Sequence, residues 1–230
     1  MSNSVKLESP LQYFHGAFYK SSSASYKSSS AFNKISAPDS LFNDQTDCGL
    51  VIKEAPLSAH LNLRGDADDS SFCSGVAAVF DVTLPLVPGT FQRNGNTSIY
   101  WLGPSEWLVV EVGGDAAAIE ATLRKSLKGH ISIVDVSGGQ TCINLRGVAV
   151  ETVLKKSSIY DFDGWDTAKA TSGRVVQTTF AKASAAVSNR SDGSYDLVIR
   201  RSFADYVAQW LLDAGGEFGC HIESSSIESN

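Results

Sequence analysis

The pattern of apolar and polar positions changes close to residue 50. Before that point the chain is rich in serine, and Ser21–Ser30 reads SSSASYKSSS. Such a stretch buries too little apolar surface to offset the entropy lost on ordering. We therefore expect residues 1–49 to form an arm that is flexible or that becomes ordered against a partner. Residues 50–222 have the pattern of a globular domain, and residues 223–230 are expected to form a disordered tail.

Within the globular part, apolar residues either alternate, as in strands, or recur every three to four positions, as in helices. The alternating segments predict strands at residues 59–64, 97–102, 107–112, 131–136, 141–146, 174–181, 185–189 and 195–200. Residues 217–222 can form a closing strand. Helices are predicted after Asp69 or Ser70, after Asp115, around residues 150–154 and after Ser202. The segment 84–96 (LPLVPGTFQRNGN) has two prolines and three turn residues, so it is predicted to be a loop.

The order of these elements recurs along the chain. Asn62–Gly65 and Asn144–Gly147 both read Asn-Leu-Arg-Gly, and each leaves a predicted strand and enters a predicted helix. The two halves, about 59–137 and 140–222, then approximate β-α-β-β-α-β, which is the split βαβ unit. The sequence therefore predicts an α+β fold made of two ferredoxin-like pseudo-repeats.

Composition excludes several classes of protein. The net charge is -6 and the sequence pI is about 5.2, whereas a nucleic-acid surface would need clustered Lys and Arg. No apolar run approaches the ~18 residues of a membrane span. The N-terminus has no apolar signal core, which favours the cytoplasm. The four cysteines are widely spaced without a CxxC pair and are expected to be buried thiols.

Recognisable catalytic and cofactor motifs are absent from the sequence. It has neither a G-x-G-x-x-G dinucleotide loop nor a G-x-x-x-x-G-K-[ST] phosphate loop, and its four histidines are isolated. Asp135 and Ser137 resemble a carboxylate and a nucleophile, but no histidine pattern completes a triad, so Asp135 is expected to fix the following turn. No catalytic, cofactor-binding or metal-ligating residue is assigned.

Three residues are candidates for an interface with a partner. Trp101 and Trp107 flank a tight turn, and a tryptophan exposed there would be a natural interface anchor. Arg200 precedes the last helix, where it could meet an acidic patch on a partner or remain solvated.

Five segments resemble the sarcosine oxidase gamma subunit family, and they occur in the family's order. They are LNLRGDA (Leu61–Ala67), IYWLGPSEWLVV (Ile99–Val110), DVSGGQTCINLRG (Asp135–Gly147), GRVVQTTFAK (Gly173–Lys182) and IRRSFADYVAQWLLDA (Ile199–Ala214). The resemblance extends over roughly residues 50–218. Glu8–Leu11 (ESPL) also matches the family's usual start, but the spacer that follows is longer than expected.

The resemblance implies a fold and a set of partners. Gamma subunits of this family resemble the folate-binding domain of the glycine-cleavage T-protein, an aminomethyltransferase, and belong to an alpha-beta-gamma-delta assembly. The alpha and beta subunits carry FAD, FMN, NAD and the amine-oxidising site, and the delta subunit carries zinc. The complex demethylates sarcosine oxidatively and passes the one-carbon unit to tetrahydrofolate on the alpha chain. This chain would then be a non-catalytic structural partner, chiefly of alpha.

Two other functions remain open. The same subunit plan occurs in N-methylglutamate dehydrogenase, which the sequence does not separate from sarcosine oxidase. The fold resemblance also admits a stand-alone, folate-dependent aminomethyltransferase, although a full T-protein is considerably longer.

Overall fold

The computed structural model describes residues 48–165, 169 and 171–223. Most of the predicted arm and almost all of the predicted tail lie outside the described residues. Within the described residues, no helix combines the length and the apolar character needed to span a membrane.

The described residues form a mixed α+β structure, which confirms the predicted fold class. The strands are β1 (Leu50–Glu54), β2 (Ser58–Arg64), β3 (Thr90–Asn94), β4 (Thr97–Gly103), β5 (Glu106–Val112), β6 (Ser132–Asp135), β7 (Gln140–Arg146), β8 (Ser172–Phe180), β9 (Ala183–Asn189), β10 (Tyr195–Arg200) and β11 (Cys220–Glu223). The α-helices are α2 (Ser70–Phe80), α3 (Ala116–Ser126), α4 (Val150–Ser157) and α5 (Ala204–Gly215). After β1, the order β-α-β-β-β-α-β occurs twice.

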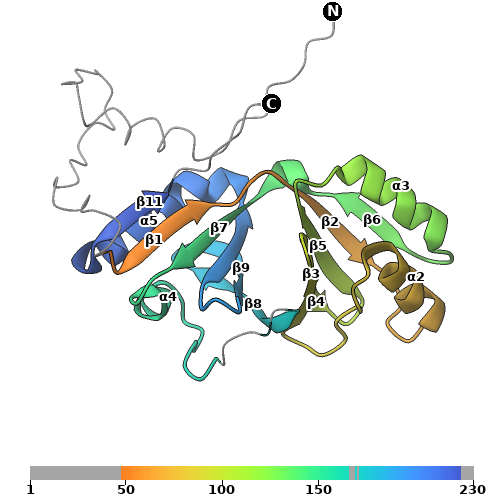
Figure 1. Ribbon diagram of the computed structural model, residues 1–230, viewed down its shortest axis with the longest axis horizontal. Coiled ribbons are helices and arrows are strands. Elements are labelled where there is room, and N and C mark those ends of the chain that lie inside the picture. The colour runs from red at the N-terminus through yellow and green to blue at the C-terminus, as the bar shows by residue number, and fades with distance from the viewer. Residues whose placement is uncertain (1–47, 166–168, 170, 224–230) are drawn as a thin grey trace, which may run out of the picture.

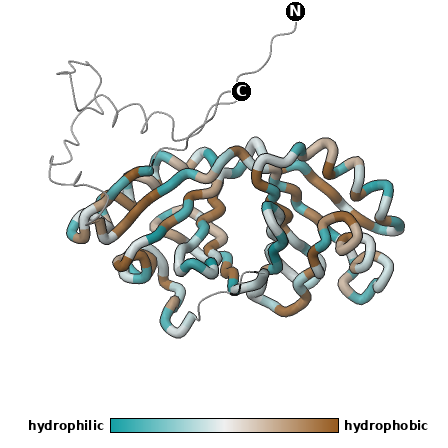
Figure 2. Tube along the Cα trace, viewed as in Figure 1, coloured by the Kyte–Doolittle hydropathy of each residue, from teal (hydrophilic) through white to brown (hydrophobic). Residues whose placement is uncertain are grey.

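The strands hydrogen-bond in the order β11-β1-β7-β10-β9-β8-β3-β4-β5-β2-β6. This sheet folds back on itself at the β3–β8 pair, giving a first half-sheet (β3 to β6) and a second half-sheet (β8 to β11). Helices α2 and α3 lie on the outside of the first half-sheet, and α4 and α5 lie on the outside of the second (Figure 1). The inner faces of the half-sheets meet in a smaller core that includes Phe91, Tyr100 and Val198. Apolar stretches follow the strands of both halves (Figure 2).

Strand β1 is inserted into the second half-sheet, although it precedes the first half-sheet in the sequence. In the first half-sheet β2 pairs directly with β6, whereas in the second β1 lies between β7 and β11, antiparallel to the former and parallel to the latter. Leu50 and Ile52 are buried against α4 and α5. The second half-sheet is therefore completed by residues that precede the first.

One predicted loop contains a strand. Segment 84–96 was expected to be irregular, but Thr90–Asn94 forms β3, which pairs with both β4 and β8. Both prolines lie before the strand, so they break none of its hydrogen bonds. Gly95, at φ 52°, makes the tight turn into β4. Each half consequently has three consecutive strands between its helices, one more than the first half was predicted to have.

The two Asn-Leu-Arg-Gly sequences need their glycines for different reasons. A Cβ atom on Gly65 would lie 2.4 Å from the ring of Phe72. Gly147 has φ +118°, and a Cβ atom there would lie 2.3 Å from the carbonyl oxygen of Gly49. That same oxygen accepts a hydrogen bond from Ala149 N at 2.9 Å. Gly147 therefore lets the start of β1 approach the start of α4.

Replacing Gly147 with alanine should lower the free energy of unfolding by about 3 kcal/mol or more. Left-handed backbone costs a non-glycine residue about 1–2 kcal/mol, and overpacking adds about 1–3 kcal/mol. Gly129→Ala is the matched control, because Gly129 also has positive φ but no atom within 4 Å of the added Cβ. It should cost only about 1–2 kcal/mol. Urea denaturation of both variants measures the difference, and equal losses would contradict the close approach.

Candidate functional site

A buried polar network joins the inner faces of the two half-sheets. Its centre is Asp196 on β10, which is 4% exposed. The carboxylate accepts hydrogen bonds from Arg93 Nη2 at 3.2 Å, Arg190 Nη1 at 3.2 Å and Asn144 Nδ2 at 2.8 Å. Arg93 lies on β3 and also donates to Ser98 through Nε at 2.8 Å. Because Arg93 belongs to the first half and Asp196 to the second, this ion pair fixes one inner face against the other.

Two ionisable groups, Tyr100 and Cys142, lie beside this network, and burial raises the pKa of both. Burial, followed by the nearby Asp196 carboxylate, raises the pKa of Tyr100 to about 12. The same two causes raise the pKa of the Cys142 thiol well above its ordinary value. Both groups are therefore protonated near neutral pH, and the Cys142 thiol is a weak nucleophile.

A central cleft of about 1020 Å³ opens between the two halves, beside the ends of the hairpins β4–β5 and β8–β9. The side chain of Gln177 on β8 crosses between the halves and donates to the carbonyl oxygen of Leu102 at 3.0 Å. The cleft is lined by residues of β2, β4, β5, β6, β7, β8, β9 and β10, together with part of the segment between β6 and β7. These residues are Asn62, Arg64, Leu102, Glu106, Leu108, Ser132, Val134, Asp135, Val136, Gly139, Gln140, Gln177, Thr178, Thr179, Ser184, Ala185, Ala186, Val198, Ile199 and Arg200.

Most charges in the central cleft are already paired with neighbours. Glu106 accepts from Arg64 Nη2 at 2.8 Å and from Asn62 Nδ2 at 2.7 Å. Arg200 is exposed, and no described carboxylate forms an ion pair with it. The described residues contain no group of three or more His, Cys, Asp or Glu side chains placed to hold a metal ion.

Asp135 fixes a turn, as predicted from the sequence. Its Oδ1 accepts from Ser137 N at 2.9 Å and from Ser137 Oγ at 2.5 Å. The ring of His60 is turned to Gln140, with Nδ1 and Oε1 2.8 Å apart. Burial lowers the pKa of His60, which favours the neutral ring. These contacts stabilise the turn after β6 and do not form a catalytic triad.

The structure corrects one of the three predicted interface residues. Trp107 is fully buried in its own half, where its ring packs 5.7 Å from that of Phe72 and its Nε1 donates to Pro85 O at 2.7 Å. Trp101 is directly opposite Trp107 in the β4–β5 ladder, so both rings point toward the helices, and Trp101 is partly exposed. The prediction for Trp107 is wrong because a side chain inside the core of its own chain cannot anchor a partner. Trp101 and Arg200 remain candidates.

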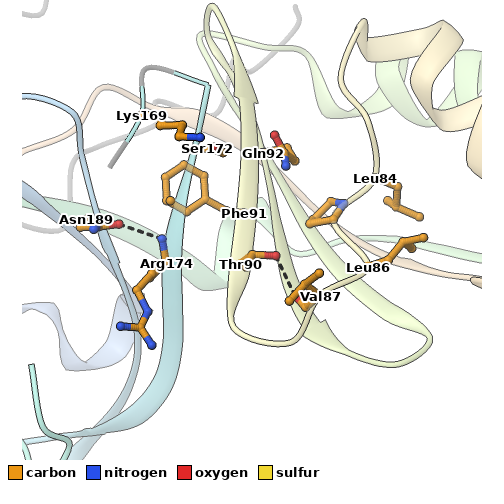
Figure 3. A pocket seen from close by; sticks show the side chains of 12 residues that line it. Leu84, Leu86, Val87, Thr90, Phe91, Gln92, Lys169, Ser172, Arg174 and Asn189 are labelled. Atoms are coloured by element: carbon orange, nitrogen blue, oxygen red, sulfur yellow. Dashed lines mark hydrogen bonds between the residues drawn. The ribbon is translucent and has the colours of Figure 1, made fainter. Parts of the chain in front are cut away.

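A second pocket, of about 520 Å³, lies over the β3–β8 pair and is called the junction pocket here. Leu84, Leu86 and Val87 lie on one side of β3, and Lys169, Ser172 and Arg174 lie on the other (Figure 3). Pro85, Thr90, Phe91, Gln92, Gly173 and Asn189 complete its lining. Sequence reasoning missed this pocket because its two walls are more than 80 residues apart along the chain and meet only through the β3–β8 pairing.

Comparison with solved structures places the fold in the class of aminomethyltransferase-like α+β proteins. The glycine cleavage system aminomethyltransferase T from Bartonella henselae has a TM-score of 0.53 at 10% identity, covering 78% of this chain and 48% of that one. A second structure, heterotetrameric sarcosine oxidase from Corynebacterium sp. U-96 in complex with pyrrole 2-carboxylate, has a TM-score of 0.66. Its identity is 25%, and the match covers 75% of this chain and 87% of that chain.

The chain belongs to the sarcosine oxidase gamma subunit family, whose sequence model matches residues 64–217. Sarcosine oxidase subunit gamma from Corynebacterium sp. (strain U-96) is 26% identical over 175 residues, covering 74% of this chain and 80% of the relative. The subunit from Corynebacterium sp. (strain P-1) is 28% identical over 173 residues, covering 73% and 80%. The resemblance to this family is thereby confirmed.

The five segments that carry the family resemblance converge on the central cleft. Each contributes at least two lining residues, although the segments extend over about 150 residues of sequence. The cleft is therefore the place where the family-like parts of the chain meet.

Removing the Asp196 carboxylate, by Asp196→Ala, should lower the free energy of unfolding by about 3–5 kcal/mol, because it leaves the Arg93 side chain, which is only 15% exposed, without its carboxylate. Glu223→Ala is the matched control. Glu223 also meets two cations, Lys53 at 2.6 Å and Arg146 at 2.5 Å, but their side chains are 40% and 56% exposed. That loss should stay below about 1 kcal/mol. Chemical denaturation compares the variants, and equal effects would argue against a buried network that holds the halves together.

Proposed function

We propose that this chain is the gamma subunit of a heterotetrameric sarcosine oxidase complex, in which it binds the other subunits and carries no catalytic residue. The observation that carries the proposal is the family match over most of the described residues. The likeness to a heterotetrameric sarcosine oxidase structure supports it. The polar groups of the central cleft support it too, because they are largely engaged with one another and not poised for a substrate.

In the proposed assembly the chain pairs chiefly with the large alpha subunit, and beta and delta complete the complex. FAD, FMN and NAD belong to alpha and beta, zinc belongs to delta, and tetrahydrofolate binds alpha. The assembly is cytoplasmic and demethylates sarcosine oxidatively. Trp101 and Arg200 remain our candidates for contacts with the partner subunits.

The central cleft does not fit folate well. The aminopyrimidinone edge of a pterin presents paired N–H donors, which a free carboxylate would accept. Of the carboxylates in the cleft, Glu106 accepts from Arg64 and Asn62, and Asp135 accepts from Ser137. A pterin would therefore have to share these carboxylates with their internal donors. Arg200 could meet a glutamyl carboxylate, but it is exposed and forms no ion pair within the part of the chain that the structure describes.

The proposal predicts a stable complex on co-expression. A tagged large alpha subunit, produced together with beta, delta and this chain from the same organism, should retain this chain in stoichiometric amount through size-exclusion chromatography. Reconstituted complexes should then oxidise sarcosine in preference to N-methylglutamate. Elution of this chain separately from the other subunits would contradict the proposal. A preference for N-methylglutamate would retain the gamma role and reassign the complex to N-methylglutamate dehydrogenase.

Titration calorimetry with tetrahydrofolate tests the stand-alone aminomethyltransferase alternative. The isolated chain should release no binding heat at ligand concentrations up to about 1 mM, because its cleft carboxylates already accept hydrogen bonds from neighbouring residues. Binding at micromolar affinity would instead favour an enzyme acting alone. Glu106→Gln is a useful second measurement, since it would weaken a genuine pterin contact.

A further inference from the structure

We propose that the junction pocket is the docking site for an extended segment of the large partner subunit that presents an aliphatic side chain next to a carboxylate. This inference deepens the proposed function and rests on it. It adds a location and a chemistry for the contact, which neither the family match nor the relatives supply.

The first observation is the apolar wall of the pocket. Leu86 is 52% exposed and Val87 is 64% exposed, and both lie beside the buried Leu84 in the segment between α2 and β3. Thr90 Oγ1 donates to Val87 O at 2.7 Å, which fixes the end of this segment against β3. These two aliphatic side chains adjoin the buried Leu84 and give the pocket an apolar wall that a partner could cover.

The second observation is the charge on the opposite wall. Lys169 and Arg174 line the pocket, and no described carboxylate forms an ion pair with either. The guanidinium of Arg174 lies 5.6 Å from the ring centre of Trp165, and this contact positions it without neutralising its charge. Figure 3 shows Lys169 across β3 from Leu86 and Val87, whereas the Arg174 side chain extends away from them. The whole chain carries a net charge of -6, so two cations at one pocket without an ion pair among the described residues are a local exception. A carboxylate on the partner would complement them.

The third observation is the position of the pocket in the fold. It lies over the β3–β8 ladder, where Thr90, Phe91 and Gln92 pair with Arg174, Gly173 and Ser172. A segment bound here touches both half-sheets at their only strand-to-strand connection within the described residues. Docking at this place would therefore restrain the two halves relative to each other.

The openness of the pocket favours a macromolecule over a small ligand. Sites for small molecules usually bury about 70–90% of the ligand surface. Here the apolar side chains project from the rim, so a small carboxylate would leave much of its own surface in water. A polypeptide can cover Leu86 and Val87 and still place one carboxylate near Lys169.

The test measures binding of this chain to the assembly of alpha, beta and delta subunits by biolayer interferometry. Leu86→Asp should raise the dissociation constant about tenfold or more, because it places a charge in a desolvated contact. Leu57→Asp is the matched control, since Leu57 is 51% exposed but does not line the pocket, and it should change the constant by less than about twofold. Both variants should unfold within a few degrees of the parent protein, since both side chains are exposed.

A charge reversal tests the second wall. Lys169→Glu should raise the dissociation constant several-fold at low salt and less at high salt, because the contact is electrostatic. Lys125→Glu on the exposed side of α3 serves as its control and should have little effect. Equal weakening by Leu86→Asp and Leu57→Asp, or no weakening by Leu86→Asp and Lys169→Glu, would overturn the docking site.

Two other results would overturn the inference, and they distinguish failure of the docking site from failure of the proposed function. If the unmodified chain does not bind the assembly, the proposed function fails together with the docking site. If the unmodified chain binds, but Leu86→Asp abolishes only self-association in analytical ultracentrifugation, the pocket belongs to a second copy of this chain. In that case the gamma role stands and the docking site falls.

Discussion

The placement of β1 between β7 and β11 is the constraint on which the remainder of the structure depends. The strand precedes the first half in sequence but completes the sheet of the second. The second half therefore cannot be removed from the chain as one continuous segment, because its sheet includes a strand that precedes the first half. The close approach of Gly147 to Gly49 anchors the beginning of this strand against α4. Pairing across about 170 residues, from Leu50 to Cys220, also gives the fold a large share of non-local contacts.

Two further connections align the halves once β1 is in place. The β3–β8 ladder joins the half-sheets at one edge, and the pair Arg93–Asp196 joins their inner faces. A buried ion pair contributes little net stability over an apolar substitute, because desolvation offsets its attraction. The ion pair forms only at a narrow range of distances and angles, however. Asp196 therefore favours one relative placement of the two inner faces over other placements. The central cleft and the junction pocket both depend on that placement.

Local pattern predicted much of the fold from the sequence, and long-range pairing accounts for what it missed. The caps of two helices were predictable, because Asp69 and Asp115 accept from the first-turn N–H groups as their sequence positions suggest. β3 was missed because five residues between prolines and a turn carry little periodicity. What identifies it as a strand is its pairing with β8, which lies far along the chain. Trp107 was misplaced because its direction depends on its position opposite Trp101 in a ladder with a bulge. The family-like segments were recognisable together, by their order along the chain, but their convergence on one cleft follows from topology alone.

The parallel pairing of β1 with β11 also determines how the fold responds to mechanical force. Because the strands are parallel, the described chain enters at the start of β1 and leaves at the end of β11, at opposite ends of one ladder. Tension between these two points acts along the strands. It loads the hydrogen bonds of the ladder together, in shear, and cannot open them one after another as in a zipper. The β1–β11 ladder should therefore resist mechanical unfolding when the described chain is pulled from its two ends.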